Sequence, residues 1–173
     1  DAFVRHTVPY RLVGSVRYYQ RRELKDMLGY LRVIYNLDDE VNLRRIINVP
    51  KRGIGSKTLA QLEMWAGELG ISMGKALQRL SHIARKKGDI DSVPFDTRAG
   101  NSLLAFGKML SEFIQTVPEH SPSELLKMIL EKTDYLAYLR DGTEEGRDRA
   151  DNILELFSAI ARYDSMSPEA ALP

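Results

Sequence analysis

The chain has 173 residues, no cysteine and a formal net charge of +1 at pH 7. Its length suffices for one domain with its own core, and a composition of 43% hydrophobic and 28% charged residues excludes disorder throughout. Without cysteine there are no disulfides or thiolate metal sites, and neither a membrane-spanning run nor a signal peptide is found. We therefore expect an intracellular, cytoplasmic protein that does not contact a membrane.

The first elements are a strand and two helices. Residues 10–19, YRLVGSVRYY, are rich in tyrosine and valine around a Gly-Ser break, which predicts a strand and a turn. Apolar side chains at helical spacing then predict an amphipathic helix over about 21–36. Asp38 or Asp39 can cap a short helix, and Pro50 ends it.

The middle of the chain predicts two more helices and a loop. Ser56 is placed to cap a helix whose apolar face carries Leu59, Leu62, Trp65, Ala66 and Leu69. A short helix follows Ser72, and residues 81–96 have the composition of a loop, either without regular structure or with one helical turn.

The last third is also helical. A long helix is predicted over about 98–117, and Ser121, Pro122 and Glu124 together form the start of the next one as a capping box. A final long helix carries Ile153, Leu156, Phe157 and Ile160. The fold class is therefore mainly α, an orthogonal bundle of several helices with a short N-terminal strand. The two ends of the chain have the character of cuts in a larger protein.

Residues 48–58, NVPKRGIGSKT, join two of these helices by a sharp turn of helix-hairpin-helix type. Gly53 can adopt the positive φ that the reversal requires, and Gly55 leaves room for another backbone. The amides of Gly55, Ser56 and Lys57 then point outward at a helix N-terminus, where the dipole favours an anion. Three cations surround this position: Lys51, Arg52 and Lys57.

The distribution of charge agrees with an anionic partner. Residues 1–58 contain 12 Lys+Arg and 6 Asp+Glu, whereas the remaining residues are acidic. The turn is therefore interpreted as a seat for nucleic-acid phosphates, which positions a protein without reading bases. The alternative is a helix–helix turn that needs glycine for its geometry and whose cations are only solvated.

Other polar residues give weaker signals. His6, His82 and His120 are too scattered to predict a metal site, and Trp65 is expected in the core. Arg147 and Arg149 either reach a second phosphate or lie on a solvated face. No phosphate loop, dinucleotide fingerprint or nucleophile elbow occurs, so we expect no catalytic residue in this chain.

Two long segments resemble a known family. They are VPYRLVGSVRYYQRRELKDMLGYLRVIYNLDDE and INVPKRGIGSKTL, and the later RADNILELFSAI adds to the match. In this order they resemble the UvrD/PcrA/Rep family of superfamily 1 DNA helicases, whose members carry an N-x-P-x-RGIG-x-x-T segment.

The resemblance implies a division of the chain and a role for the turn. Residues 1–37 correspond to the 2A motor subdomain, 38–166 to the helical 2B subdomain, and 167–173 to the return into 2A. The RGIG turn of the family contacts the backbone of duplex DNA ahead of the single-strand junction. That role would fall on Arg52, Gly53, Ile54, Gly55 and Thr58, with Lys51, Ser56 and Lys57 beside them.

The resemblance also sets the expected partners and cofactors. Arg17 would face the single strand in an intact motor. ATP and Mg would be bound by the parent helicase, because the ATP phosphate loop, the Asp-Glu metal pair and the arginine fingers of the family are missing here. Further partners are the other helicase subdomains, an accessory repair protein, and a second copy of the chain through residues 10–35. The parent would be associated with the nucleoid.

Three hypotheses follow from the sequence. The first is a regulatory subdomain of a DNA repair or replication helicase that contacts double-stranded DNA near a single-strand junction. The second is a protein-interaction module that docks an accessory factor, with a purely structural hairpin. The third is a stand-alone helix-hairpin-helix repair factor.

Overall fold

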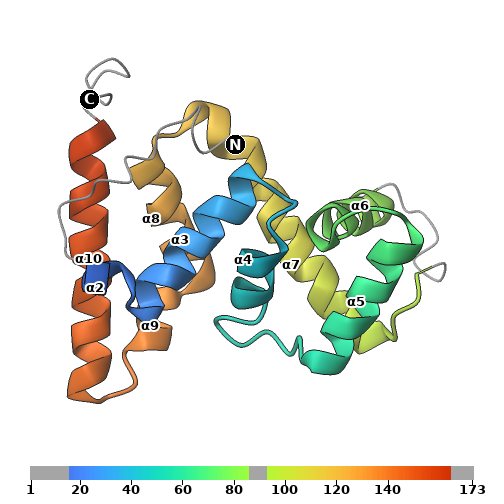
Figure 1. Cartoon of the computed structure of the whole chain (residues 1–173), viewed down its shortest axis with the longest axis horizontal. Helices are drawn as coiled ribbons and strands as arrows, with labels where there is room; N and C mark the ends of the chain where they lie inside the picture. The colour runs from blue at the N-terminus through green and yellow to red at the C-terminus, as the bar shows by residue number, and fades with distance from the viewer. Residues whose placement is uncertain (1–15, 86–92, 165–173) are drawn as a thin grey trace. The chain divides into compact units, whose positions relative to one another are not determined.

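The computed structural model describes residues 16–85 and 93–164, and within these ranges the chain is helical and contains no strand (Figure 1). The prediction of a mainly α fold is confirmed. The elements are α2 (Val16–Tyr19), α3 (Arg22–Tyr35), α4 (Glu40–Ile46), α5 (Ser56–Glu68), α6 (Met73–Arg85), α7 (Thr97–Thr116), the 3-10 helix η2 (Val117–Glu119), α8 (Pro122–Thr133), α9 (Tyr135–Leu139) and α10 (Glu144–Asp164). None of the helices in these ranges has the length and apolarity needed to cross a membrane.

The chain divides into two compact units. One contains residues 1–31 and 116–173, and the other contains residues 32–115. The boundaries between motor and helical subdomains that the sequence suggested remain a prediction.

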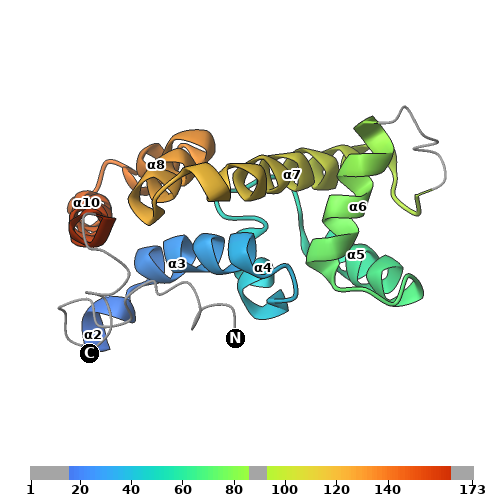
Figure 2. The same cartoon turned by 90° about the horizontal axis from the view of Figure 1, so that it is seen from above.

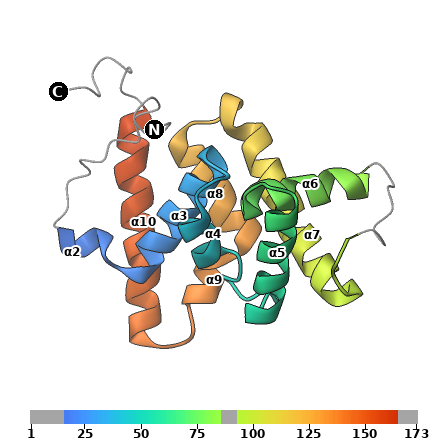
Figure 3. The same ribbon diagram turned by 45° about the vertical axis from the view of Figure 1, so that its right-hand side comes forward.

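In the first unit, α8, α9 and α10 pack against one another. Figure 3 shows the short loop that leads from α9 to the start of α10. Side chains from α8 and α10 make up much of the buried core: Leu125, Leu126, Ile129, Ile153, Leu156 and Ile160. The predicted capping box is confirmed, because Ser121 accepts from the Glu124 amide and Glu124 accepts from the Ser121 amide at 2.8 Å.

The predicted strand over 10–19 is wrong where the structure describes it. Residues 10–15 lie outside the described part of the chain, and residues 16–19 form α2. The Tyr18 hydroxyl donates to the Asn152 carbonyl of α10 at 3.1 Å, and Arg21 donates to the Asn152 side chain and stacks on the Tyr18 ring. These contacts with α10 outweigh the weak strand preference of tyrosine and valine.

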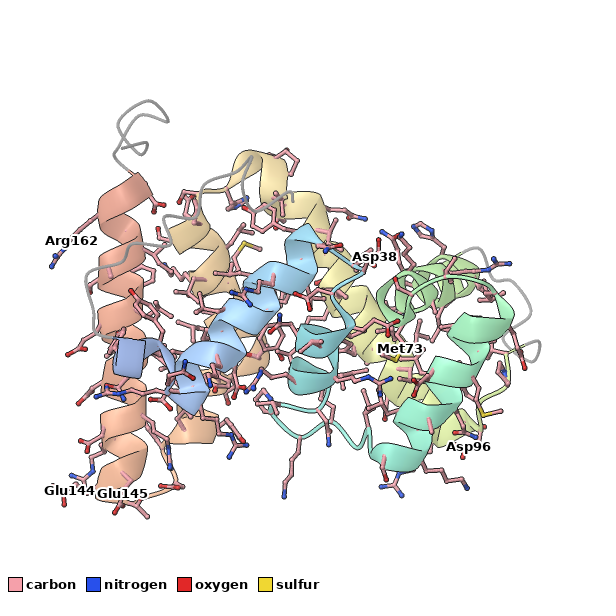
Figure 4. The ribbon with its side chains drawn as sticks, in the orientation of Figure 1. Asp38, Met73, Asp96, Glu144, Glu145 and Arg162 are labelled. Atoms are coloured by element: carbon pink, nitrogen blue, oxygen red, sulfur yellow. The ribbon has the colours of Figure 1, made fainter. Side chains whose placement is uncertain are left out.

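In the second unit, α6 packs against α4 and α5, and Figure 2 shows α5 and α6 side by side. The sequence offered Asp38 or Asp39 as the cap of α4, and the structure shows that Asp39 is the cap. Asp39 caps α4 by accepting from the Asn42 amide at 3.1 Å. Asp38 (Figure 4) instead pairs with Lys75 of α6 at 2.8 Å, a hydrogen bond that lowers the pKa of the Asp38 carboxyl.

The helical turn allowed within the loop predicted over 81–96 is present at its start, since α6 continues to Arg85. Ser81 is fully buried, and its hydroxyl donates to the Leu77 carbonyl at 3.1 Å. A Cβ on Gly107 would lie only 2.8 Å from Ser81 Oγ, so α6 and α7 approach closely at this point. Close packing against α7 therefore extends the helix beyond the limit that its polar sequence suggested.

Candidate nucleic-acid interface

Residues 47–55 connect α4 to α5. The connection runs from Ile47, the C-cap of α4, through a cis Val49–Pro50 peptide bond to Gly55, which precedes α5. Gly53 has φ +75°, in the left-handed region. The nearest atom to a Cβ built there would be Ser102 Oγ at 3.7 Å, so the backbone conformation, and not lack of space, requires glycine.

Two residues, Asn48 and Ile54, hold the backbone of the turn in place. Asn48 Oδ1 accepts from the Arg52 amide at 2.7 Å and from the Ile54 amide at 3.3 Å. The Ile54 side chain is 3% exposed and belongs to the core of this unit. Ile54 is therefore a buried anchor of the turn.

The Arg52 side chain is directed at the turn's own backbone. Its Nη1 donates to the carbonyls of Ile46 at 3.1 Å, Ile47 at 3.3 Å and Pro50 at 3.1 Å. Its guanidinium also lies over the Phe106 ring, 5.2 Å from the centroid. Carbonyls at a helix C-terminus favour a cation. Arg52 thus links the end of α4 to α7.

The helix after the turn begins without a side-chain cap. The prediction that Ser56 is the cap is wrong, because Gly55 is the N-cap and its carbonyl accepts from the Leu59 amide at 3.0 Å. The chain enters the helix one residue earlier than predicted, and Gly55 has no side chain to accept from the first turn. The first-turn amides, at Ser56, Lys57 and Thr58, have no intrahelical partner. Ser56 and Lys57 are exposed, and Thr58 is half-buried.

The start of α5 is open to solvent, and two lysines of the turn are exposed. A Cβ built on Gly55 would meet no atom within 4 Å, so a ligand can approach from outside. Lys51 and Lys57 are exposed, and within the described residues neither forms an ion pair. Arg44 of α4, by contrast, is neutralised by Glu63 of α5 at 2.6 Å. The turn therefore combines backbone donors at a helix N-terminus with two uncompensated lysines.

The sequence was compared with families of known proteins. The model of one family, the UvrD-like helicase C-terminal domain, matches residues 1–172. The chain belongs to this family. The match covers both compact units, including the whole α4–α5 turn.

Individual members of the UvrD-like family show the same relationship. The ATP-dependent DNA helicases PcrA of Staphylococcus epidermidis and Staphylococcus aureus are both 32% identical to the chain over 169 residues. The alignment covers 97% of this chain but 22% of each helicase. The chain thus spans about a fifth of the length of the curated relatives it matches.

The remaining candidates in this UvrD-like chain belong to the other unit. Arg149 is paired with Asp141 at 2.8 Å, whereas Arg147 is exposed near the start of α10. Glu144 and Glu145 project from the same helical turn (Figure 4) and reduce its positive potential. The Arg17 side chain lies outside the described residues. Lys51 to Thr58 therefore lie together in one turn of the second unit, whereas Arg147 and Arg149 belong to the first.

The structure places Trp65 and two of the three histidines, for which the sequence predicted no role in a site. Trp65 is 7% exposed and packs edge-on against Phe95, which confirms the prediction of a core position. His82 is exposed and His120 Nδ1 contacts the Thr116 carbonyl, while His6 lies outside the described part. No cluster of potential metal ligands occurs in the described residues.

Two residues that shape the turn, Asn48 and Phe106, are not among the site residues predicted from the sequence. Asn48 lies two residues before Pro50, and an asparagine in such a position is typical of a residue that organises a turn. Phe106 appeared as one of many apolar residues in a long helix. Nothing in its sequence context identifies it as the partner of Arg52.

Proposed function

We propose that the chain is a non-catalytic part of an ATP-dependent DNA helicase, equivalent to the regulatory 2B subdomain, and that it holds duplex DNA by its sugar-phosphate backbone. The observation that carries the proposal is the N-terminus of α5, which has no side-chain cap and begins with the exposed Ser56 and Lys57, with the exposed Lys51 earlier in the same turn. Membership of the UvrD-like family and the named relatives support the assignment to a helicase.

The chemistry of the turn fits a phosphate and not a base. Free amides at a helix N-terminus bind an anion through hydrogen bonds and the helix dipole. The flanking lysines neutralise neighbouring phosphates on the same strand. Nothing in this arrangement reads base edges, so binding would be independent of sequence and weak at physiological salt.

The motor function would belong to the rest of the helicase. The sequence contains no phosphate loop, so the binding of ATP and Mg is assigned to the parts of the protein beyond this chain. The proposed partners are therefore duplex DNA next to a single-strand junction and the motor subdomains of the same protein. Contact with the duplex would set the position of the helicase relative to the junction.

A salt titration tests the proposal. The chain would be titrated onto a fluorescent duplex with a single-stranded tail, from about 50 to about 300 mM salt. We expect log K to fall linearly with log salt with a slope of about −2 to −3, because two or three phosphates are contacted at about −0.9 each. The double variant Lys51→Glu/Lys57→Glu should lose binding.

A matched control separates the turn from net charge. Arg79 and Lys108 are exposed on α6 and α7 of the same unit. The variant Arg79→Glu/Lys108→Glu has the same net charge as the turn variant and should retain most of the affinity. Equal losses in both variants, or binding that does not respond to salt, would contradict the proposal.

A further inference from the structure

The segment between α4 and α5 depends on side chains to define its shape. Asn48 supplies one carboxamide oxygen to two amides, those of Arg52 and Ile54. A carbonyl oxygen has two lone pairs, and both are used here. Asn48 therefore fixes the two residues that flank Gly53 at the same point.

Arg52 supplies the second set of restraints. One nitrogen, Nη1, reaches the carbonyls of Ile46, Ile47 and Pro50, all on the N-terminal side of Gly53. The planar guanidinium is held over Phe106, which is 1% exposed. A lysine ammonium has neither the planar fork nor the stacking face needed to reproduce this arrangement.

These restraints set the direction in which the next helix begins. Arg52 is bound on one side of Gly53, and Ile54 is buried on the other. The chain between them has little freedom, so the positive φ of Gly53 sets the direction in which the chain enters α5 through the exposed Gly55, Ser56 and Lys57. Pre-organised donors bind more tightly because ordering them costs nothing at the moment of binding.

We propose that Arg52 is a positioning residue of the phosphate-binding turn and not a phosphate ligand, and that Asn48 and Phe106 act with it. This inference rests on the proposed function, since it assigns roles within the same site. It changes the role that the sequence suggested for Arg52, and it leaves Lys51, Lys57 and the backbone amides as the groups that touch DNA.

Two variants distinguish positioning from direct contact. Arg52→Lys keeps the charge, so a phosphate ligand would tolerate it, whereas a residue that braces three carbonyls would not. Phe106→Leu changes no charge, and Phe106 is too deeply buried to touch DNA. Arg79→Lys, at an exposed position of α6, is the matched control for exchanging arginine for lysine.

The experiment measures duplex affinity and the turn's own geometry in the same chain. We expect Arg52→Lys and Phe106→Leu each to weaken duplex binding about tenfold, which corresponds to ~1.4 kcal/mol. Arg79→Lys should bind like the unmodified chain. In amide NMR spectra without DNA, both turn variants should shift the signals of Gly53 and Gly55 and leave those of Gly67 and Gly70 in place. Far-UV circular dichroism checks that the helices remain.

The outcomes separate this inference from the proposed function. If Arg52→Lys and Phe106→Leu bind as tightly as the unmodified chain, the positioning role is wrong although duplex binding stands. Loss of affinity without movement of the Gly53 and Gly55 signals would also overturn it, because Arg52 would then act on DNA directly. If the unmodified chain shows no salt-dependent binding, the proposed function fails, and the glycine signals still decide whether Arg52 and Phe106 hold the turn.

Discussion

The hydroxyl of Tyr135 donates a hydrogen bond to Oδ2 of Asp26 at 2.8 Å, and both side chains are almost completely buried. The bond joins α9 to α3, two helices far apart in the sequence. Beside it, the Asn152 side chain of α10 donates to Glu23 of α3 at 2.8 Å. The first unit thus contains two buried carboxylates, each stabilised by a donor from a distant helix.

Removing the Tyr135 hydroxyl should destabilise the fold. Tyr135→Phe leaves the buried Asp26 carboxylate without one of its donors and should lower the free energy of unfolding by about 1–3 kcal/mol. Tyr138→Phe is the control, because Tyr138 is 36% exposed and its hydroxyl can be replaced by water. Urea denaturation of both variants measures the difference, and equal stabilities would contradict the role of the Tyr135–Asp26 bond.

The same phenol should make stability fall at alkaline pH. Burial raises the pKa of Tyr135 above its ordinary value of 10.0, and the Asp26 charge adds to the effect. In the unfolded chain the phenol ionises near pH 10, whereas in the folded chain it keeps its proton. The Tyr135 phenol should therefore leave the free energy of unfolding unchanged below about pH 10 and lower it as the pH rises above that value.

Urea titrations at about pH 9 and about pH 11.5 would measure this loss. Tyr18, whose pKa is raised to about 12 mainly by burial, contributes in the same direction. The Tyr135→Phe variant should lose less stability between the two pH values, because one of the contributing phenols is gone. If Tyr135→Phe loses as much free energy of unfolding between the two pH values as the unmodified chain does, other groups cause the alkaline loss of stability.

Two glycines of the second unit should respond in opposite ways to alanine. A Cβ on Gly107 would lie 2.7 Å from the Leu77 carbonyl oxygen and would force α6 and α7 apart, at a cost of about 1–3 kcal/mol. Gly67, in the last turn of α5, has no atom within 4 Å of such a Cβ. Gly67→Ala should be neutral or stabilise the chain by up to about 0.5 kcal/mol through helix propensity. Thermal unfolding of the two variants tests whether Gly107→Ala lowers the stability and whether Gly67→Ala leaves it unchanged or raises it.

The sequence predicts the longer helices because their apolar spacing and their caps are local properties. The capping box of α8 was identified residue by residue, and α3 and α7 agree closely with their predicted limits. The short α9 was missed. It has five residues, too few to show a period, and follows Asp134 at φ 50°.

The role of the candidate site stays a prediction, and the sequence signals for it are those of local chemistry. Glycines, lysines and a new helix in one short segment indicate an anion site without any knowledge of the fold. The direction of the Arg52 side chain depends on where Phe106 lies, and that is decided by tertiary packing. Charge alone made Arg52 look equivalent to Lys51, whereas its contacts make it part of the turn's framework.

The two glycines of the turn should differ in their tolerance of alanine. Gly53→Ala would place a Cβ in the left-handed region and should cost about 1–2 kcal/mol. Gly55 has φ −85° and ψ −178°, which any residue can adopt, and open space around its Cβ position. Gly55→Ala should therefore stay within about 0.5 kcal/mol of the unmodified chain. Similar losses in both variants would show that Gly55 is also required for folding.

Capping α5 with a side chain should stabilise the fold and weaken DNA binding at the same time. An Asn or Asp at position 55 can accept from the first-turn amides, which favours the helix by about a few tenths of a kcal/mol over glycine. The same acceptor occupies the donors that are proposed to hold a phosphate. We therefore expect duplex affinity to fall in Gly55→Asn and to fall further in Gly55→Asp, whose charge repels phosphate, while Gly55→Ala binds normally.

Fluorescence anisotropy and urea denaturation on the three variants measure both effects. Normal binding by Gly55→Asn would mean that the α5 amides do not contact the DNA, since a neutral cap removes nothing else from the site.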